Sequence, residues 1–112
     1  MTQGWHILRD GDTLTLAWHL PARFDVSAQG HLPGGRAERL AHQIRQDLWR
    51  ALQNVRGFSP VVRLEREGDG WRVTAGGRVM GKVPPALCLR IGALLDDGPT
   101  RQRWLRKAGG LR

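Results

Sequence analysis

The strongest pattern in the sequence is an amphipathic segment that divides the chain between two groups of strand-forming residues. From Arg36 to Arg56 the apolar residues recur at helical spacing and share one side of a helical wheel. Gly57 follows them, and glycine commonly ends a helix. Because such a helix is stable only where its apolar stripe packs on another element, the flanking segments must supply a sheet. The stripe consists of Ala37, Leu40, Ala41, Ile44, Leu48, Ala51, Leu52 and Val55.

Before this helix the sequence predicts a β-hairpin. Asp10-Gly11 is a strong two-residue turn signal between strands at 5–9 and 13–20. Alternate residues of the two strands then share one apolar face, and the other face is polar, as in a half-buried antiparallel pair. The expected opposed pairs are Arg9 with Asp12, Ile7 with Leu14, and Trp5 with Leu16.

The segment between the hairpin and the helix is less regular. Pro21 interrupts the second strand, and Arg23 to Ala28 can form either a short third strand or a loop. Gln29 to Gly35 contains three glycines and a proline, a composition typical of loops. We therefore expect a loop that leads directly into the long helix.

After the helix the pattern predicts a three-strand antiparallel meander. Its strands are expected at 60–66, 71–75 and 78–83, with turns at 67–70 and at Gly76-Gly77. Pro84-Pro85 ends the sheet, since proline lacks a backbone N–H but is tolerated at the start of a helix.

Two shorter helices are expected at the C-terminal end. The first has an apolar face that includes Leu87 and Ile91, with Cys88 beside it as a buried thiol. Gly98-Pro99 breaks this helix, and the last one runs from Thr100 to Ala108.

The element order predicts a single α+β domain over residues 1–112. Its mainly antiparallel sheet, an N-terminal hairpin plus a three-strand meander, is packed by one long helix and two shorter C-terminal helices. A chain of 112 residues closes one core and leaves little length for a second. No apolar run approaches the roughly 18 residues needed to span a bilayer, and no secretory signal is visible. With Cys88 as its one cysteine, the chain is expected in the cytoplasm of a bacterium or in an organelle.

The positive charge of the chain is concentrated in its C-terminal half. The net charge is +8; residues 1–56 carry seven basic and five acidic side chains, and residues 57–112 carry eleven and five. From about residue 99 onward there are five basic side chains and no acidic one. Arginine supplies 16 of the 18 basic residues, as expected from a GC-rich genome, so the uneven distribution is more informative than the total. It favours an acidic partner, of which nucleic acid is the commonest.

The candidate contact residues lie on the last helix and on the polar face of the long helix. Basic side chains there suit phosphate groups, and a tryptophan can stack on a base. The alternative for Trp104 is that it docks the last helix on the core while the arginines are solvated. Candidate contacts to nucleic acid or to a protein partner are Arg101, Arg103, Trp104, Arg106, Lys107, Arg39, Trp49 and Arg50.

Trp49 lies outside the apolar stripe of the long helix. An exposed tryptophan near Arg45 and Arg56 can contact a base or an aromatic group of a partner. The alternative is a half-buried ring at the rim of the core, which is the usual position of tryptophan.

No catalytic or cofactor-binding constellation is visible. The four histidines and Cys88 do not show metal-ligand spacing, and neither serine lies in a nucleophile elbow. Residues 31–36 match neither a Walker A loop nor a dinucleotide fingerprint. Asp96-Asp97 fits a solvated turn better than a metal site. We therefore expect no cofactor, no metal and no enzymatic activity, although an unfamiliar active site is not excluded.

The sequence favours a small binding module that acts through protein–protein contacts. The alternative is a nucleic-acid-binding domain that uses the basic C-terminal helix. The partner is unidentified in either case, and a homodimer is one arrangement that the sequence leaves open.

Overall fold

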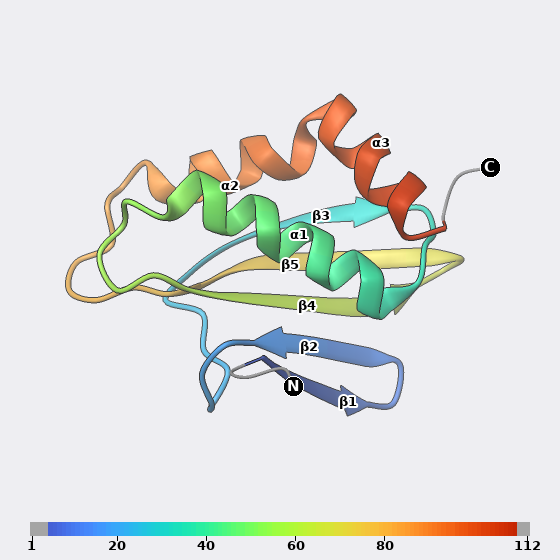
Figure 1. Cartoon of the computed structure of the whole chain (residues 1–112), viewed down its shortest axis with the longest axis horizontal. Coiled ribbons are helices and arrows are strands. Elements are labelled where there is room, and N and C mark those ends of the chain that lie inside the picture. The colour runs from blue at the N-terminus through green and yellow to red at the C-terminus, as the bar shows by residue number, and fades with distance from the viewer. Residues whose placement is uncertain (1–4, 110–112) are drawn as a thin grey trace.

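The computed structural model describes residues 5–109 and contains a five-stranded sheet with three helices (Figure 1). The helices lie on one face of the sheet, which confirms the α+β class with a mainly antiparallel sheet. Within these residues no helix is long and apolar enough to cross a membrane. The elements are β1 (His6–Asp10), β2 (Thr13–Ala17), β3 (Val26–Leu32), α1 (Ala37–Leu52), β4 (Ser59–Glu67), β5 (Gly70–Arg78), α2 (Leu87–Asp96) and α3 (Gly98–Lys107).

The strands follow the order β1-β2-β4-β5-β3, and every neighbouring pair is antiparallel. After β2 the chain crosses to the far edge of the sheet, where β3 pairs with β5 (Figure 1). β3 extends from Val26 to Leu32, so the expected loop at 29–35 is wrong over its first four residues. The N-terminal hairpin and β3 therefore form opposite edges, with β4 and β5 between them.

The hairpin register differs from the expected one. Asp10 pairs with Thr13, and Ile7 lies opposite Leu16 rather than Leu14. The turn residues are Gly11 and Asp12, and Gly11 has a φ of 61°. A positive φ at the first central residue is what a type II′ hairpin turn requires, and glycine adopts it without a steric penalty. The shift keeps the same residues on the same face, so the expected apolar face remains correct.

The predicted strand at 78–83 is wrong, because β5 runs without interruption through Gly76 and Gly77. A Cβ atom on Gly76 would collide with the carbonyl oxygen of Val26 in β3. One on Gly77 would collide with the carbonyl oxygen of Ser59 in β4. The two glycines therefore allow the neighbouring strands to approach β5 and do not form a turn.

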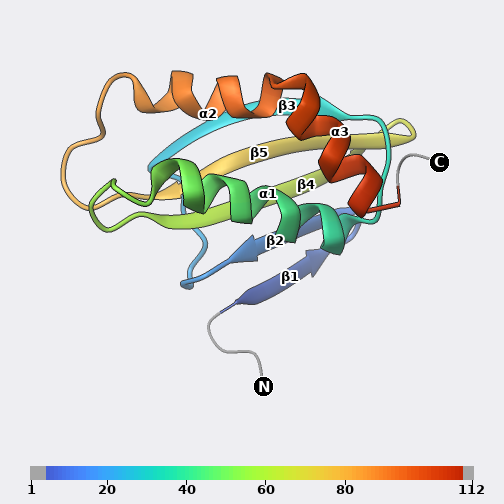
Figure 2. The same cartoon turned by 45° about the horizontal axis from the view of Figure 1, so that its top comes forward.

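The core lies between the sheet and the helices (Figure 2). α1 packs over β4 and β2, α2 over β3, and α3 against α1 and α2. Five residues of the expected stripe of α1 are buried, Leu40, Ala41, Ile44, Leu48 and Leu52. Ala51 is exposed, Ala37 and Val55 are partly buried, and the helix ends at Leu52 rather than at Arg56. In α2 the buried residues Leu87, Ile91 and Leu95 recur at i, i+4 and i+8. This spacing turns Cys88 outward, so the expectation of a buried thiol is wrong.

Candidate functional site

An open pocket lies between α1 and the end of the N-terminal hairpin where β1 begins and β2 ends. Its volume is about 380 Å³, within the usual range for ligand sites. Carbon atoms form most of its lining, and three of its residues are tryptophans. This tryptophan pocket is lined by Trp5, Trp18, His19, Arg45, Trp49, Phe58 and Pro60.

The hairpin supplies two of the three rings. Trp5 directly precedes β1 and Trp18 directly follows β2, so antiparallel pairing brings them together just beyond the last paired residues. Their ring centroids are 4.9 Å apart at an interplanar angle of 71°, an edge-to-face arrangement. Trp18 is 37% exposed, so a large part of this pair remains open to water.

Arg45 and Trp49 form the wall on α1. They lie one helical turn apart and therefore point to the same side of the helix. The Arg45 guanidinium lies 4.6 Å from the centre of the Trp5 ring, and its Nε donates a 3.4 Å hydrogen bond to Nδ1 of His42. Burial holds the pKa of Arg45 below its usual value. Trp49, whose exposure the sequence leaves open, is 47% exposed.

Phe58 and Pro60 are the buried members of the lining, at the start of β4. Among the described residues that form the lining, Arg45 and His19 carry the polar side chains besides the indole N–H groups, and none of these residues has a carboxylate. Nδ1 of His19 lies 3.0 Å from Oγ of Ser59, which is 5% exposed. A serine buried beneath its histidine cannot attack a substrate, so this pair is a structural hydrogen bond.

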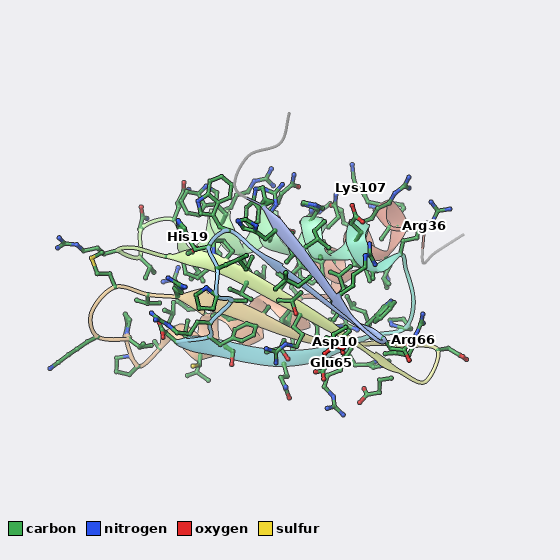
Figure 3. All side chains as sticks on the ribbon, turned by 90° about the horizontal axis from the view of Figure 1, so that it is seen from below. Asp10, His19, Arg36, Glu65, Arg66 and Lys107 are labelled. Atoms are coloured by element: carbon green, nitrogen blue, oxygen red, sulfur yellow. The ribbon has the colours of Figure 1, made fainter. Side chains whose placement is uncertain are left out.

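A second, basic pocket of about 470 Å³ lies where the start of α1 meets the end of α3. The backbone N–H of Arg36 donates a 2.9 Å hydrogen bond to the carbonyl oxygen of Ala108, which joins the two helices there. Arg36 and Lys107 lie at the same end of the molecule, and His19 lies toward the other end (Figure 3). The lining of the basic pocket is Arg36, Glu38, Arg39, His42, Gln43 and Lys107.

Trp104, a candidate for stacking on a base, is fully buried. Its Nε1 donates a 2.6 Å hydrogen bond to Oδ2 of Asp47 on α1. The predicted stacking role is therefore wrong, and the alternative, that Trp104 docks the last helix on the core, is confirmed. The sequence pattern does not reveal that Asp47 is the hydrogen-bond acceptor of Trp104, because Asp47 is a polar residue beside the apolar stripe.

Several of the predicted phosphate-contacting arginines bind other groups of the protein. Arg103 donates to Oδ2 of Asp47 at 2.8 Å, and Arg50 lies 3.5 Å from the other oxygen of that carboxylate. Arg101 donates to the carbonyl oxygens of Leu95 and His31, at 3.1 and 2.6 Å. The contacts of Arg101 and Arg103 hold α3 in place, and the Asp47 carboxylate offsets part of the positive charge of the segment.

Three predicted basic residues remain open to a partner. Arg39, Arg106 and Lys107 are exposed, and none of them takes part in an ion pair within residues 5–109. Arg39 of α1 and Lys107 of α3 line the same pocket, so the two basic groups expected from the sequence do meet in the fold. Glu38, in the same lining, is paired with Arg9 at 2.8 Å.

The remaining polar candidates have structural roles. Asp97 caps α3 by accepting hydrogen bonds from the backbone N–H and the hydroxyl of Thr100, at 3.1 and 2.6 Å. In the described part of the chain no three His, Cys, Asp or Glu residues are grouped so as to hold a metal ion. His31 lies 3.9 Å from Glu67 and does not approach His42 in the basic pocket.

Sequence reasoning found Trp49 but missed most of the pocket around it. Trp5 and Trp18 are expected on the apolar face of the hairpin, which is where they lie, but the helix does not cover this end of the hairpin. The missed signal is a tryptophan at both open ends of a hairpin, together with a third at the edge of a helical stripe.

Comparisons of this chain with protein-family models, with curated proteins and with solved structures find no match.

Proposed function

We propose that this protein is a non-enzymatic binding module that holds a partner protein in the tryptophan pocket. The observation that supports this most directly is the open, carbon-lined pocket with three tryptophans around it. Exposed aromatic surface is unfavourable in water, and its burial against a partner lowers the free energy of the complex. Tryptophan and arginine are also the side chains that most often dominate binding energy at protein interfaces.

The chemistry of the pocket suits binding better than catalysis. The described residues of its lining include no serine, cysteine or carboxylate that could act as a nucleophile or as a general acid. The ring of His19 is hydrogen-bonded to a buried serine. A side chain of a partner that fills this volume would contact rings on both the hairpin and α1.

The proposal can be tested by comparing what tagged variants capture from cells that make the protein. The pocket variant carries Trp18→Ala and Trp49→Ala, two substitutions of exposed rings. The control is Leu89→Ala, because Leu89 is an apolar side chain of α2 that is 76% exposed and outside the pocket. We expect a protein that wild type and the control retain and the pocket variant loses, with the same order of affinities when that protein is purified. Equal retention by all three would contradict the proposal.

A second candidate function is nucleic-acid binding by the basic pocket. It is favoured by the meeting of Arg36, Arg39 and Lys107 at the junction of α1 and α3. Three phosphate contacts would weaken binding to duplex DNA roughly 40-fold between about 50 and 200 mM salt, by counterion release. The double substitution Arg39→Glu and Lys107→Glu should then abolish binding. Failure of wild type to bind mixed-sequence oligonucleotides at the lower salt concentration would eliminate this candidate.

A further inference from the structure

Arg45 is a partly buried arginine in the wall of the tryptophan pocket. Within residues 5–109 it has no carboxylate partner, although its guanidinium is partly buried against the Trp5 ring. Its one hydrogen bond to a side chain is the 3.4 Å contact with His42. By contrast, the arginines that do pair with a carboxylate are Arg9, Arg23, Arg50, Arg72 and Arg103.

A guanidinium in this position is suited to a carboxylate from outside the chain. Arginine remains charged at all ordinary pH values, and its planar fork binds a carboxylate through two parallel hydrogen bonds. Partial burial strengthens that attraction, because less water separates the two charges than at an open surface. Contact with the Trp5 ring already restricts the guanidinium, so less side-chain freedom is lost when a partner binds.

We propose that the tryptophan pocket recognises an acidic segment of the partner protein, in which an aromatic or large aliphatic side chain lies next to a carboxylate. This inference rests on the proposed function. The apolar side chain packs against Trp18, Trp49 and Phe58, and the neighbouring carboxylate pairs with Arg45.

The net charge of the chain supports an acidic partner. Arg39, on the same helix, is exposed and has no ion-pair partner in the described residues, and the chain carries a net charge of +8. Such a field attracts an acidic segment before contact and raises the rate of association. A cage of tryptophans without a nearby cation would suit a methylated ammonium group, but the Arg45 charge in the wall repels one.

The test uses three capped pentapeptides that share a central phenylalanine and differ in the four flanking residues, which are all glutamate, all glutamine or all lysine. Binding is followed by the indole N–H resonances of ¹⁵N-labelled protein. We expect the glutamate peptide to shift the Trp18 and Trp49 resonances and to bind at least about tenfold more tightly than the glutamine peptide, a modest effect for one charge-assisted pair. The lysine peptide should bind most weakly.

Two variants with the same change of charge separate Arg45 from the general field of the protein. Arg45→Gln should remove the preference for glutamate over glutamine, which is measured as the ratio of the affinities of the two peptides for the same variant. Arg50→Gln is the matched control, because Arg50 lies on the same helix, outside the pocket, and is paired with Asp47. It should retain the preference. Arg45→Lys keeps the charge but loses the planar fork, so this variant should keep only part of the preference for the glutamate peptide.

The possible results distinguish the inference from the proposed function. Equal affinity of wild type for the glutamate and glutamine peptides, with binding lost in Trp49→Ala, would overturn the inference and leave the proposed function standing. If no peptide shifts the Trp18 or Trp49 resonances at millimolar concentration, both are overturned. A pentathymidylate that shifts the same indoles more tightly than the glutamate peptide would replace the protein partner by nucleic acid. A dimer in sedimentation that Trp49→Ala dissociates would identify a second copy of the chain as the occupant.

Discussion

Asp47 on α1 accepts a 2.6 Å hydrogen bond from the indole N–H of Trp104 on α3, and both residues are buried. The same carboxylate oxygen also accepts from Arg103 at 2.8 Å. One acidic side chain therefore satisfies the polar atom of the most deeply buried ring and neutralises part of the basic α3 helix. This contact fixes the position of α3 and with it the α1–α3 junction that forms the basic pocket.

Removal of the Asp47 carboxylate should therefore destabilise the whole fold. In Asp47→Ala the buried indole N–H of Trp104 has no acceptor and Arg103 has no counter-charge, which costs about 1–3 kcal/mol. The free energy of unfolding in urea measures the effect. Asp69→Ala is the control, because Asp69 is exposed in the β4–β5 turn, and its change should stay within about 0.5 kcal/mol. Equal stability of the two variants would show that the buried hydrogen bond is dispensable.

Alanine substitution at two glycines should change stability in opposite directions. Gly76→Ala places a methyl group against the carbonyl oxygen of Val26, so it should lower the free energy of unfolding by at least about 2 kcal/mol. Gly92 lies inside α2, and a methyl group there meets Ala28 only at an ordinary distance of 3.9 Å. Gly92→Ala should therefore stabilise the protein by about 0.5–1 kcal/mol. Thermal and urea unfolding check both values, and a tolerated Gly76→Ala would contradict the close approach of β3 to β5.

His42 should make the protein less stable as the solution is acidified through neutral pH. Burial, and then the charge of Arg45, hold the pKa of His42 below its usual 6.5, while Glu38 acts in the opposite direction. Because the unfolded chain takes up this proton more readily, the contribution of His42 is complete above pH 6.5 and is lost as pH falls toward the lower folded-state pKa. Unfolding at about pH 7.5 and about pH 5.5 measures the loss. His42→Gln should reduce the difference between the two pH values, and an unchanged difference would contradict this assignment.

Asp97 should stabilise α3 except in strong acid. Hydrogen bonds from the Thr100 side chain and backbone hold the pKa of Asp97 below its usual 3.8. Its stabilising effect is therefore complete above pH 3.8 and disappears as pH falls through the folded-state pKa. Asp97→Ala should lower the unfolding midpoint at neutral pH, and Asp97→Ser, which keeps a capping oxygen, should restore part of it. In strong acid wild type should lose its advantage over Asp97→Ala, whereas the smaller advantage of Asp97→Ser should not depend on pH. A constant gap between wild type and Asp97→Ala at every pH would contradict the role of the Asp97 carboxylate.

The helices and the hairpin of this fold could be predicted from the sequence because the local geometry of a helix or a strand determines which positions are apolar. The stripe of α1 and the apolar spacing of α2 give the helices, and the apolar face of the hairpin is correct even though its register is shifted by the turn at Gly11. The use of Gly76 and Gly77 could not be predicted, because a close approach of neighbouring strands and a tight turn select glycine equally well. The strand order depends on contacts between residues far apart in the chain, which no local pattern records.

The candidate site, like the fold, could be predicted only where a local pattern reveals it. Trp49 could be placed at the edge of the helical stripe, but its partners Trp5 and Trp18 lie on the hairpin, and only the packing of α1 brings them together. Trp104 lies on a basic segment, and the sequence does not show that Asp47 faces it across the helix interface. The sequence therefore places most candidate contacts on the basic C-terminal segment, whereas the structure adds a candidate site in the tryptophan pocket.

The central claim, that the tryptophan pocket holds a partner protein, is tested most directly by photo-crosslinking in cells that make the protein. Trp49 is replaced by the photoreactive residue p-benzoylphenylalanine, which keeps an aromatic side chain at the pocket wall, and Leu89 is replaced in a parallel control. We expect one dominant crosslinked protein from position 49, lost when Trp18→Ala is added, and no such product from position 89. No crosslink at position 49, or the same products from both positions, would contradict it.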